Sequence, residues 1–476
     1  MLEFRFLFLF FPWMIAVADP GSLLLAAKRI EAKSVDLIEA TGFLDGPSVP
    51  TNLPENGIYP KGLRMHIGAY AAMENPSINV PGKTNLERLV EGGFTVAGPY
   101  YGWDPAKHLV TLRAASKLGL RLAIQLTEPP SIRKQNIDVR DRPALMRDLS
   151  DAEVRQYFRD WMSTFLNNPE IEPYVSSWAA GPEELHPSSR EEVHFLEVLA
   201  DAVHSIDSKR RPIFEYQPNN RSSTGLEKIS APLDFVFMGA YTSAIGWSET
   251  RGARINWAME QILGAALAGG QVPMVGLRLS KDLPGFKADD LRASKELSSR
   301  LHALLRHDTW LALARGAKAI QIWSMWEKRL NLSTHREQFD AYASVALELT
   351  GKDDLQTPLL FGDKRTDLSI EILSGPTKIR AHAEDLGDTD ESYKGMSDGS
   401  WSSITLGNFS LRGSRTLVVV NSASEPVQAA IVGIPGTSIK CTDISGSEAH
   451  TEGLKQKRIL LNMPAFGVWI GRLTKQ

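Results

Sequence analysis

Short apolar segments alternate with longer amphipathic segments between residues 61 and 350. Each apolar segment has the length of a strand and lacks a helical period, which is typical of strands buried on both faces of a parallel sheet. We expect eight such strands, at residues 63–70, 94–98, 121–126, 174–180, 211–217, 234–241, 272–279 and 319–323.

The segments between these strands carry helix-start signals. Ser/Thr-x-x-Glu capping boxes begin at Thr84, Ser150 and Ser188, and Asp104 precedes a proline suited to a first helical position. A strand and a helix repeated in this way predict an α/β fold, a (β/α)8 TIM barrel over residues 61–350. An open doubly wound sheet is the alternative, but no glycine-rich phosphate motif follows any predicted strand.

The pattern changes after residue 350. A polar stretch over 351–366 is expected to link the barrel to a second domain. From 367 to 476 only short strands follow, separated by Gly, Ser, Asp and Asn turns, which predicts a small all-β sandwich domain. Before the barrel, residues 19–60 are rich in turns, and we expect them to pack as a lead-in on its outside.

The N-terminus is strongly apolar. Residues 6–17 form a run too short to span a bilayer comfortably, and the A-x-A sequence at 16–18 matches a signal-peptide cleavage site. A signal peptide over 1–18 and a secreted or periplasmic protein are therefore predicted. The charge of Arg5 is offset by Glu3, so a retained N-terminal membrane anchor is the alternative. No other stretch has membrane-spanning length, so we expect no integral span once the signal is removed.

Composition narrows the classes of function. The formal net charge of -3 provides no basic surface for nucleic acid. Cys441 is the single cysteine, which excludes a disulfide within the chain and a multi-cysteine metal site. The ten histidines show neither H-x-H nor H-E-x-x-H spacing, so we expect no metal and no cofactor. The oligomeric state stays open at this level.

Glu183 and Glu184 stand directly after the fourth predicted strand. The C-terminal ends of barrel strands are where (β/α)8 enzymes keep their catalytic groups. Several carboxylates among aromatic side chains are what glycosidic-bond cleavage requires, namely an acid for the leaving oxygen, a second carboxylate and flat faces for sugar rings. The other strand ends bring such groups to the same mouth, and the candidates are Tyr70, Tyr101, Trp103, Glu128, Glu215, Tyr241, Trp323 and Trp326.

Several segments resemble barrel glycoside hydrolases. Residues 169–183 look like the fourth-strand segment of these enzymes, where the general acid/base glutamate stands about five residues after a tryptophan, and counting from Trp178 leads to Glu183. The others are 312–323, similar to the entry into the eighth strand, and 418–421 with 463–468, which resemble the accessory β-domain. No single family is indicated. The resemblance implies an exported hydrolase that cleaves O-glycosidic bonds of an oligo- or polysaccharide, with Glu183 as general acid/base.

One position departs from that resemblance. In the largest clan of these enzymes the nucleophile glutamate ends the seventh strand, whereas residues 274–280 contain Arg278 and no carboxylate. The second carboxylate is then expected from Glu215, Glu128 or Glu327, with Glu215 preferred because its strand neighbours that of the acid/base. The alternatives are inversion through a water, or a catalytically inactive barrel that binds carbohydrate or acts as a scaffold. Sugar, linkage and stereochemistry stay open.

Each candidate also has a structural interpretation. For Glu183 it is a solvated acid near a helix N-terminus, favoured by the helix dipole. For Glu215 it is a barrel-interior acid held in an ion pair. Glu184 is expected to point away or to serve as a hydrogen-bonding partner, and packing is the alternative for the aromatic candidates. Arg278 is expected to pair with an interior carboxylate or to bind an acidic substituent on a sugar.

Overall fold

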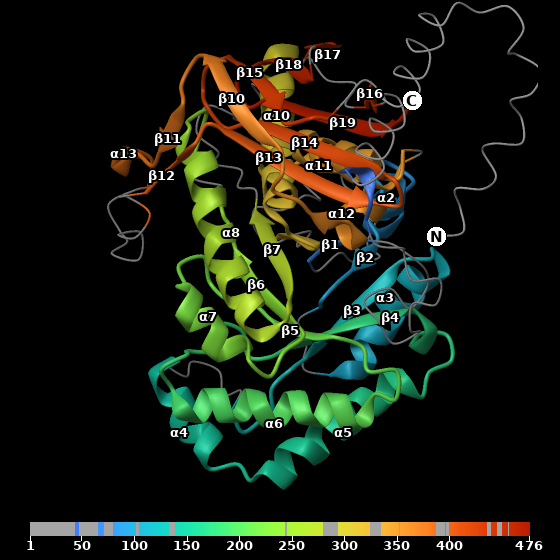
Figure 1. Cartoon of the computed structure of the whole chain (residues 1–476). Coiled ribbons are helices and arrows are strands. Elements are labelled where there is room, and N and C mark those ends of the chain that lie inside the picture. The colour runs from blue at the N-terminus through green and yellow to red at the C-terminus, as the bar shows by residue number, and fades with distance from the viewer. Residues whose placement is uncertain are drawn as a thin grey trace, which may run out of the picture.

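The computed structural model describes most of the chain from residue 65 onwards (Figure 1). The described residues are 43–46, 65–70, 80–100, 104–132, 139–242, 245–278, 294–323, 335–351, 353–386, 396, 399–435, 439–444, 450–455 and 457–476. Within them, a parallel barrel covered by helices forms the first part of the chain, and antiparallel sheets form the second.

Eight parallel strands form the barrel, one at each predicted position. Their spatial order is β5-β4-β3-β2-β1-β8-β7-β6. Backbone hydrogen bonds from Asp234 to Ile213 (3.0 Å) and from Gly239 to Gln217 (3.2 Å) join the two end strands, so the sheet closes on itself and the predicted (β/α)8 barrel is confirmed. The strands are β1 (His66–Ala69), β2 (Val96–Ala97), β3 (Arg121–Leu126), β4 (Val175–Ala180), β5 (Ile213–Glu215), β6 (Phe235–Gly239), β7 (Val272–Arg278) and β8 (Ala319–Trp323).

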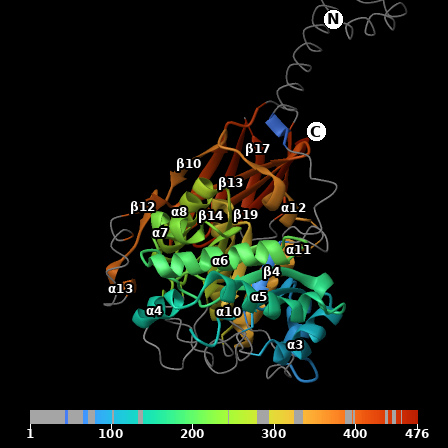
Figure 2. The same ribbon diagram turned by 90° about the horizontal axis from the view of Figure 1, so that it is seen from below.

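Helices cover the outside of the barrel, and α5 and α6 lie side by side on one flank (Figure 2). The capping boxes predicted at Thr84 and Ser150 are complete, and Asp104 caps the helix that it precedes. The third cap is displaced by one residue, because Ser189 rather than Ser188 accepts the bond from the first turn. The helices are α2 (Asn85–Glu91), α3 (Pro105–Lys117), α4 (Arg142–Arg147), α5 (Asp151–Leu166), α6 (Arg190–Ile206), α7 (Ser223–Ser230), α8 (Thr250–Gly269), α10 (Lys295–Arg315) and α11 (Arg336–Thr350), with 3-10 turns at Val139–Asp141 and Glu172–Tyr174.

Side chains along each barrel strand alternate between the barrel interior and the layer of helices. On β5, Ile213 belongs to the large core between strands and helices, whereas Phe214 belongs to the cluster inside the barrel. Tyr216 lies in the same inner cluster. Glu215, between two inward-facing residues, therefore faces the helices. This orientation decides what Glu215 is able to contact.

Antiparallel strands form the C-terminal part, and the predicted all-β sandwich domain is confirmed. One sheet has the order β10-β15-β18-β17, a second has the order β16-β19-β14-β13-β9, and a short β11-β12 pair lies beside them. Leu417, Leu461 and Trp469 are buried in the core of this domain. The strands are β9 (Asp363–Lys364), β10 (Ser369–Ser374), β11 (Lys378–Arg380), β12 (Ser400–Ser402), β13 (Ile404–Leu411), β14 (Ser414–Asn421), β15 (Val427–Val432), β16 (Ile439–Asp443), β17 (His450–Lys455), β18 (Arg458–Met463) and β19 (Val468–Lys475).

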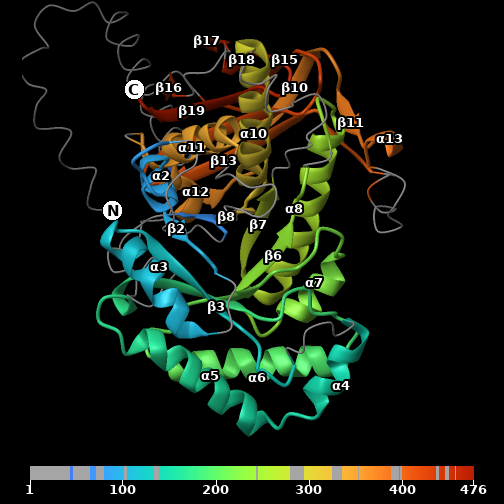
Figure 3. The same ribbon diagram turned by 180° about the vertical axis from the view of Figure 1, so that it is seen from behind.

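The barrel and the sandwich pack directly against each other. Helix α10 lies between the barrel strands and strands β14 and β19 (Figure 3). Val418, Val468 and Ile470 of those strands belong to the same buried apolar cluster as the barrel helices. The stretch predicted as a polar link contains α12 (Gln356–Phe361) and β9, which pairs with β13 and so extends the second sheet.

Four residues of the predicted lead-in are described, and they lie on the sandwich. Phe43 and Leu44 are buried in its core. Arg415 on β14 donates from Nε to the carbonyl of Phe43 (2.5 Å), and its guanidinium stacks on the Phe43 ring. The predicted signal peptide lies outside the described residues. Among the described helices, none is both long and apolar enough to cross a membrane.

Candidate active site

The loop after β4 carries Glu183 and Glu184. Ala180 is the last residue of β4 that pairs with β3 and β5, and the loop begins after it. The Glu183 side chain is half-buried, and the Tyr70 hydroxyl donates a hydrogen bond to its Oε1 (3.3 Å). Since Tyr70 directly follows β1, this bond crosses the C-terminal mouth of the barrel, where the sequence predicted the site.

Glu184 occupies a different environment from its neighbour. It is exposed, and its φ of 60° lies in the left-handed region, which is uncommon for a residue other than glycine. Its backbone N–H donates to the carbonyl of Tyr216 (2.9 Å), which holds this conformation in place. The turn at Glu184 therefore separates the two carboxylates, and Glu183 is the one that contacts Tyr70.

Aromatic side chains from three strands surround the mouth beside Glu183. The Tyr70 ring makes edge-to-face contacts with Tyr216 and Trp323, each with ring centroids 5.5 Å apart. The Tyr216 hydroxyl is buried and has no hydrogen-bond partner among the described residues. Burial, followed by the nearby charge of Glu183, raises the pKa of Tyr216 well above its ordinary value. A buried hydroxyl without a partner costs free energy, and the described residues supply no partner here.

Tyr241 and Arg278 occupy the ends of β6 and β7. Burial raises the pKa of Tyr241, and the charge of Glu183 acts in the same direction, so its hydroxyl stays protonated. The Arg278 guanidinium lies 5.7 Å from the ring centroid of Tyr241 and 5.2 Å from that of Trp323. The sequence-based expectation of an interior carboxylate beside Arg278 is not met among the described residues, where aromatic faces flank it instead.

A buried arginine holds the backbone of the acidic loop. Arg142 donates to the carbonyl oxygens of Glu183 (3.1 Å) and Glu184 (3.2 Å). Its Nε forms an ion pair with the fully buried Glu192 (2.8 Å), whose other oxygen accepts from the backbone of His186. Sequence analysis did not find Arg142, because its contacts reach across 41 residues to Glu183 and leave no local pattern.

Glu215 is fully buried beneath the same loop. Leu185 N donates to its Oε1 (3.1 Å), and Gln217 Nε2 donates to its Oε2 (2.5 Å). Burial raises the pKa of Glu215 to about 8, and the charge of Glu183 adds to the effect. Because it faces the helix layer and spends both oxygens on the protein, its predicted role as second catalytic carboxylate is not supported by this placement. Its partners are an amide and a backbone N–H rather than the ion pair of the structural interpretation.

Glu128 lies on the mouth side of the loop. It follows β3 and is half-buried. Gly181 follows the inward-facing Ala179 and the outward-facing Ala180, so a Cβ at Gly181 would point inward, and it would meet Glu128 Oε2 at 3.3 Å. A carboxylate oxygen of Glu128 therefore reaches the inner side of the barrel beside the loop that carries Glu183.

The structure brings together several of the predicted site residues: Tyr70, Glu128, Glu183, Tyr241 and Trp323. Glu184 is exposed to solvent, and Glu215 is buried beneath the loop. The predicted Tyr101, Trp103 and Trp326 fall outside the described residues. In the part of the chain that the structure describes, no group of three or more His, Cys, Asp or Glu side chains could hold a metal ion.

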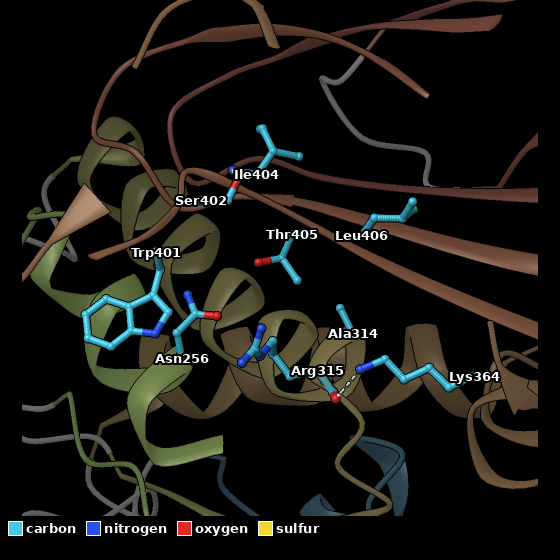
Figure 4. Close-up of a pocket in the computed structure, with 9 residues that line it drawn as sticks. All are labelled: Asn256, Ala314, Arg315, Lys364, Trp401, Ser402, Ile404, Thr405 and Leu406. Atoms are coloured by element: carbon cyan, nitrogen blue, oxygen red, sulfur yellow. Dashed lines mark hydrogen bonds between the residues drawn. The ribbon is translucent and has the colours of Figure 1, made fainter. Parts of the chain in front are cut away.

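A cavity of about 200 Å³ lies between α8, α10 and strands β12 and β13, away from the barrel mouth (Figure 4). Lys364 donates from Nζ to the carbonyl of Arg315 (2.5 Å), and Trp401 donates from Nε1 to Glu260 (2.9 Å). Burial, with Arg315 nearby, lowers the pKa of Lys364 to about 8. The first contact ties the end of α10 to β9 and the second ties α8 to β12, so the cavity belongs to the junction of the two domains.

No family model matches the sequence, and no curated protein matches it. Solved structures do match the fold. An α-amylase from Anoxybacillus aligns over 86% of this chain and 98% of its own, with a TM-score of 0.53 and 12% identity. An α-amylase from Geobacillus thermoleovorans, solved with acarbose, covers 86% and 98%, with a TM-score of 0.50 and 8% identity. AmyP, solved with maltose, covers 86% and 97%, with a TM-score of 0.50 and 8% identity. The chain therefore shares its fold with barrel glycoside hydrolases.

Proposed function

We propose that the protein hydrolyses O-glycosidic bonds of an oligo- or polysaccharide, with Glu183 as general acid/base. The observation that carries this proposal is the place of Glu183, half-buried at the barrel mouth and bonded to Tyr70. The α-amylases with the same fold, among them the structures solved with acarbose and maltose, support a carbohydrate ligand. Export follows the predicted signal peptide over 1–18 and belongs to the proposal.

The mouth offers the parts that this chemistry needs. Glu183 is placed to give a proton to the leaving oxygen, and the Tyr70 hydroxyl orients its carboxyl group. The faces of Tyr70 and Trp323 are suited to holding the apolar side of a sugar ring.

Glu128 is our choice for the second carboxylate. It reaches the inner side of the barrel next to the loop of Glu183, whereas Glu215 faces away from it. In glycosidases the two carboxyl groups lie roughly 5 Å apart for retention and roughly 6.5–9.5 Å apart for inversion. The anomeric form of the first product therefore decides between a nucleophile and a base at Glu128.

The test is hydrolysis of a panel of oligo- and polysaccharides by Glu183→Gln, with Glu184→Gln as the matched control. Loss of the acid/base removes the proton that the leaving group needs, so we expect activity to fall about 100-fold or more in Glu183→Gln. The exposed neighbour should keep activity within about threefold of the wild type, as surface substitutions do. Equal losses in both variants, or none, would contradict the assignment.

The second candidate is a barrel that binds carbohydrate without cleaving it. The observation that favours it is the end of β7, where Arg278 stands in place of a carboxylate. In that case the wild type and Glu183→Gln bind the same glycans with the same affinity, and neither releases reducing ends from any of them.

A further inference from the structure

Arg278 lies at the same mouth as Glu183. It ends β7, and its guanidinium is flanked by Tyr241, which follows β6, and by Trp323, which ends β8. Trp323 contacts the ring of Tyr70, whose hydroxyl bonds Glu183. A continuous set of side chains therefore connects the cation to the proposed acid/base.

Arg278 differs from three of the arginines that the fold buries completely. Arg211, Arg251 and Arg415 each form an ion pair with an aspartate, and these aspartates are Asp207, Asp308 and Asp367. A fourth, Arg254, lies over the ring of Trp257 and donates to the carbonyl of Asn219. No described carboxylate pairs with Arg278, which is half-buried between two aromatic faces. Stacking fixes the plane of a guanidinium but uses none of its five N–H donors. No described residue accepts a hydrogen bond from Arg278, so within the described part of the chain its donors are available to a ligand.

The chemistry of this group selects its ligand. A planar guanidinium binds a carboxylate or a sulfate through two parallel hydrogen bonds, and the charge makes these bonds strong. A neutral sugar requires no such cation, and a guanidinium partly removed from water is costly without a counter-charge. The cation at the end of β7 therefore favours an anionic substituent on the sugar.

We propose that this site takes an anionic glycan, in which Arg278 binds the carboxylate or sulfate group of one sugar while the glycosidic oxygen lies at Glu183. The proposal rests on the proposed function only for the place of the glycosidic oxygen. A uronic acid and a sulfated sugar share the required charge, and the experiment separates them.

The experiment is isothermal titration calorimetry with three matched ligands. They are a hexamer of a polyuronic acid, the same hexamer after its carboxyl groups are reduced to alcohols, and a sulfated neutral glycan. Titrations are run on the wild type and on Glu183→Gln, which prevents turnover of the ligand. We expect the reduced hexamer to bind about tenfold more weakly than the uronate, or the sulfated glycan to be the ligand that binds.

Two arginine variants locate the charge. Arg278→Met keeps an unbranched stem between the aromatic rings and removes the cation, so affinity for the anionic ligand should fall about 10- to 100-fold. Arg278→Lys keeps the charge without the bidentate geometry, so its affinity for the anionic ligand should lie between those of the wild type and Arg278→Met. The control is Arg300→Met, since Arg300 also stacks on an aromatic ring, that of Trp247 at 4.5 Å, and should bind as the wild type does.

The outcomes separate this inference from the proposed function. Equal affinity for the uronate and its reduced form without sulfate binding, or unchanged affinity in Arg278→Met, overturns the inference. Binding that depends on Arg278, with no hydrolysis of any glycan, keeps the inference and overturns the proposed function. Hydrolysis of a neutral glycan that is lost in Glu183→Gln and unchanged in Arg278→Met keeps the proposed function and overturns the inference.

Discussion

Glu183 and Glu184 are neighbours in sequence with different environments. The left-handed backbone at Glu184 turns the chain. The N–H of Glu184 donates to the carbonyl of Tyr216, and Arg142 donates to the carbonyls of Glu183 and Glu184. A non-glycine residue in that region costs on the order of 1 kcal/mol or more, which these bonds offset. Strain held in this way fixes where the Glu183 carboxyl group lies, and placement is what acid/base catalysis depends on.

Glu215 supports the same loop from beneath. Its hydrogen-bond donors are Leu185 N and Gln217 Nε2, and neither is charged. The neutral acid accepts a bond from Leu185 N without burying a charge, whereas the ionised form would be a buried charge bonded only to neutral donors. Its folded pKa of about 8 lies above the ordinary value of 4.5. We therefore regard Glu215 as a positioning residue that is protonated at neutral pH.

This assignment predicts a specific dependence of stability on pH. A carboxyl group with a raised folded pKa contributes stability that is fully present below about pH 4.5 and is lost as pH rises through about pH 8. Residue 215 of Glu215→Gln is neutral at every pH, so the stability of this variant should lack this dependence. Above pH 8 its free energy of unfolding should exceed that of the wild type by on the order of a few kcal/mol. Urea unfolding of both proteins at pH 5, 7 and 9 measures it, and parallel curves would refute the raised pKa.

At the scale of elements, α4 holds the loop that carries Glu183 through the side chain of Arg142. Arg142, at the start of α4, joins the backbone of the loop to Glu192 on α6. Glu192 is fully buried, and its two oxygens accept hydrogen bonds from Arg142 Nε and from the backbone N–H of His186. Contacts with two helices hold the backbone of this loop in a fixed conformation, which keeps Glu183 in a defined position.

Arg142→Met is expected to destabilise the protein and to slow catalysis. Removing one partner of a buried ion pair leaves the other charge uncompensated, at a cost of about 3–5 kcal/mol. The control is Arg147→Met on the same helix, whose pair with Glu191 is exposed and worth under about 1 kcal/mol. Thermal unfolding and kcat/KM are measured for both. Glu192→Gln in the Arg142→Met background should recover part of the stability, and a failure to do so would argue against the buried pair as the cause.

The elements themselves were predictable because both faces of the barrel sheet are buried. β3 and β8 coincide with the predicted runs, since a strand covered on two sides is apolar throughout. The same property hid which way Glu215 faces, because alternation carries no sign when both sides are apolar. The role of Arg142 and the cap at Ser189 depend on the folded structure rather than on local sequence pattern. The pattern therefore did not identify Arg142 and placed the helix cap one residue too early, at Ser188.

At the scale of the whole molecule, the barrel and the sandwich share part of one apolar core, and the sandwich also has a core of its own. Val418, Val420 and Phe466 of the sandwich are buried together with Leu305 and Leu311 of α10. Arg306 on the same helix donates to the carbonyl of Val468 (3.0 Å). The second domain therefore covers apolar surface of the barrel, and the two parts should unfold together.

Gly407 gives a direct test of that coupling. It lies on β13 against α10, and a Cβ there would lie 2.9 Å from Ala314 Cα, which is backbone of the helix. Gly407→Ala should therefore push the sandwich from the barrel and cost about 1–3 kcal/mol. Gly225→Ala is the control, because Gly225 lies in α7 with its nearest neighbour at 3.4 Å, and alanine favours a helix. Calorimetry should show one transition, lowered by Gly407→Ala and unchanged or raised by Gly225→Ala. A second peak, with only one part shifted by Gly407→Ala, would mean that the domains fold independently and that the shared core contributes little.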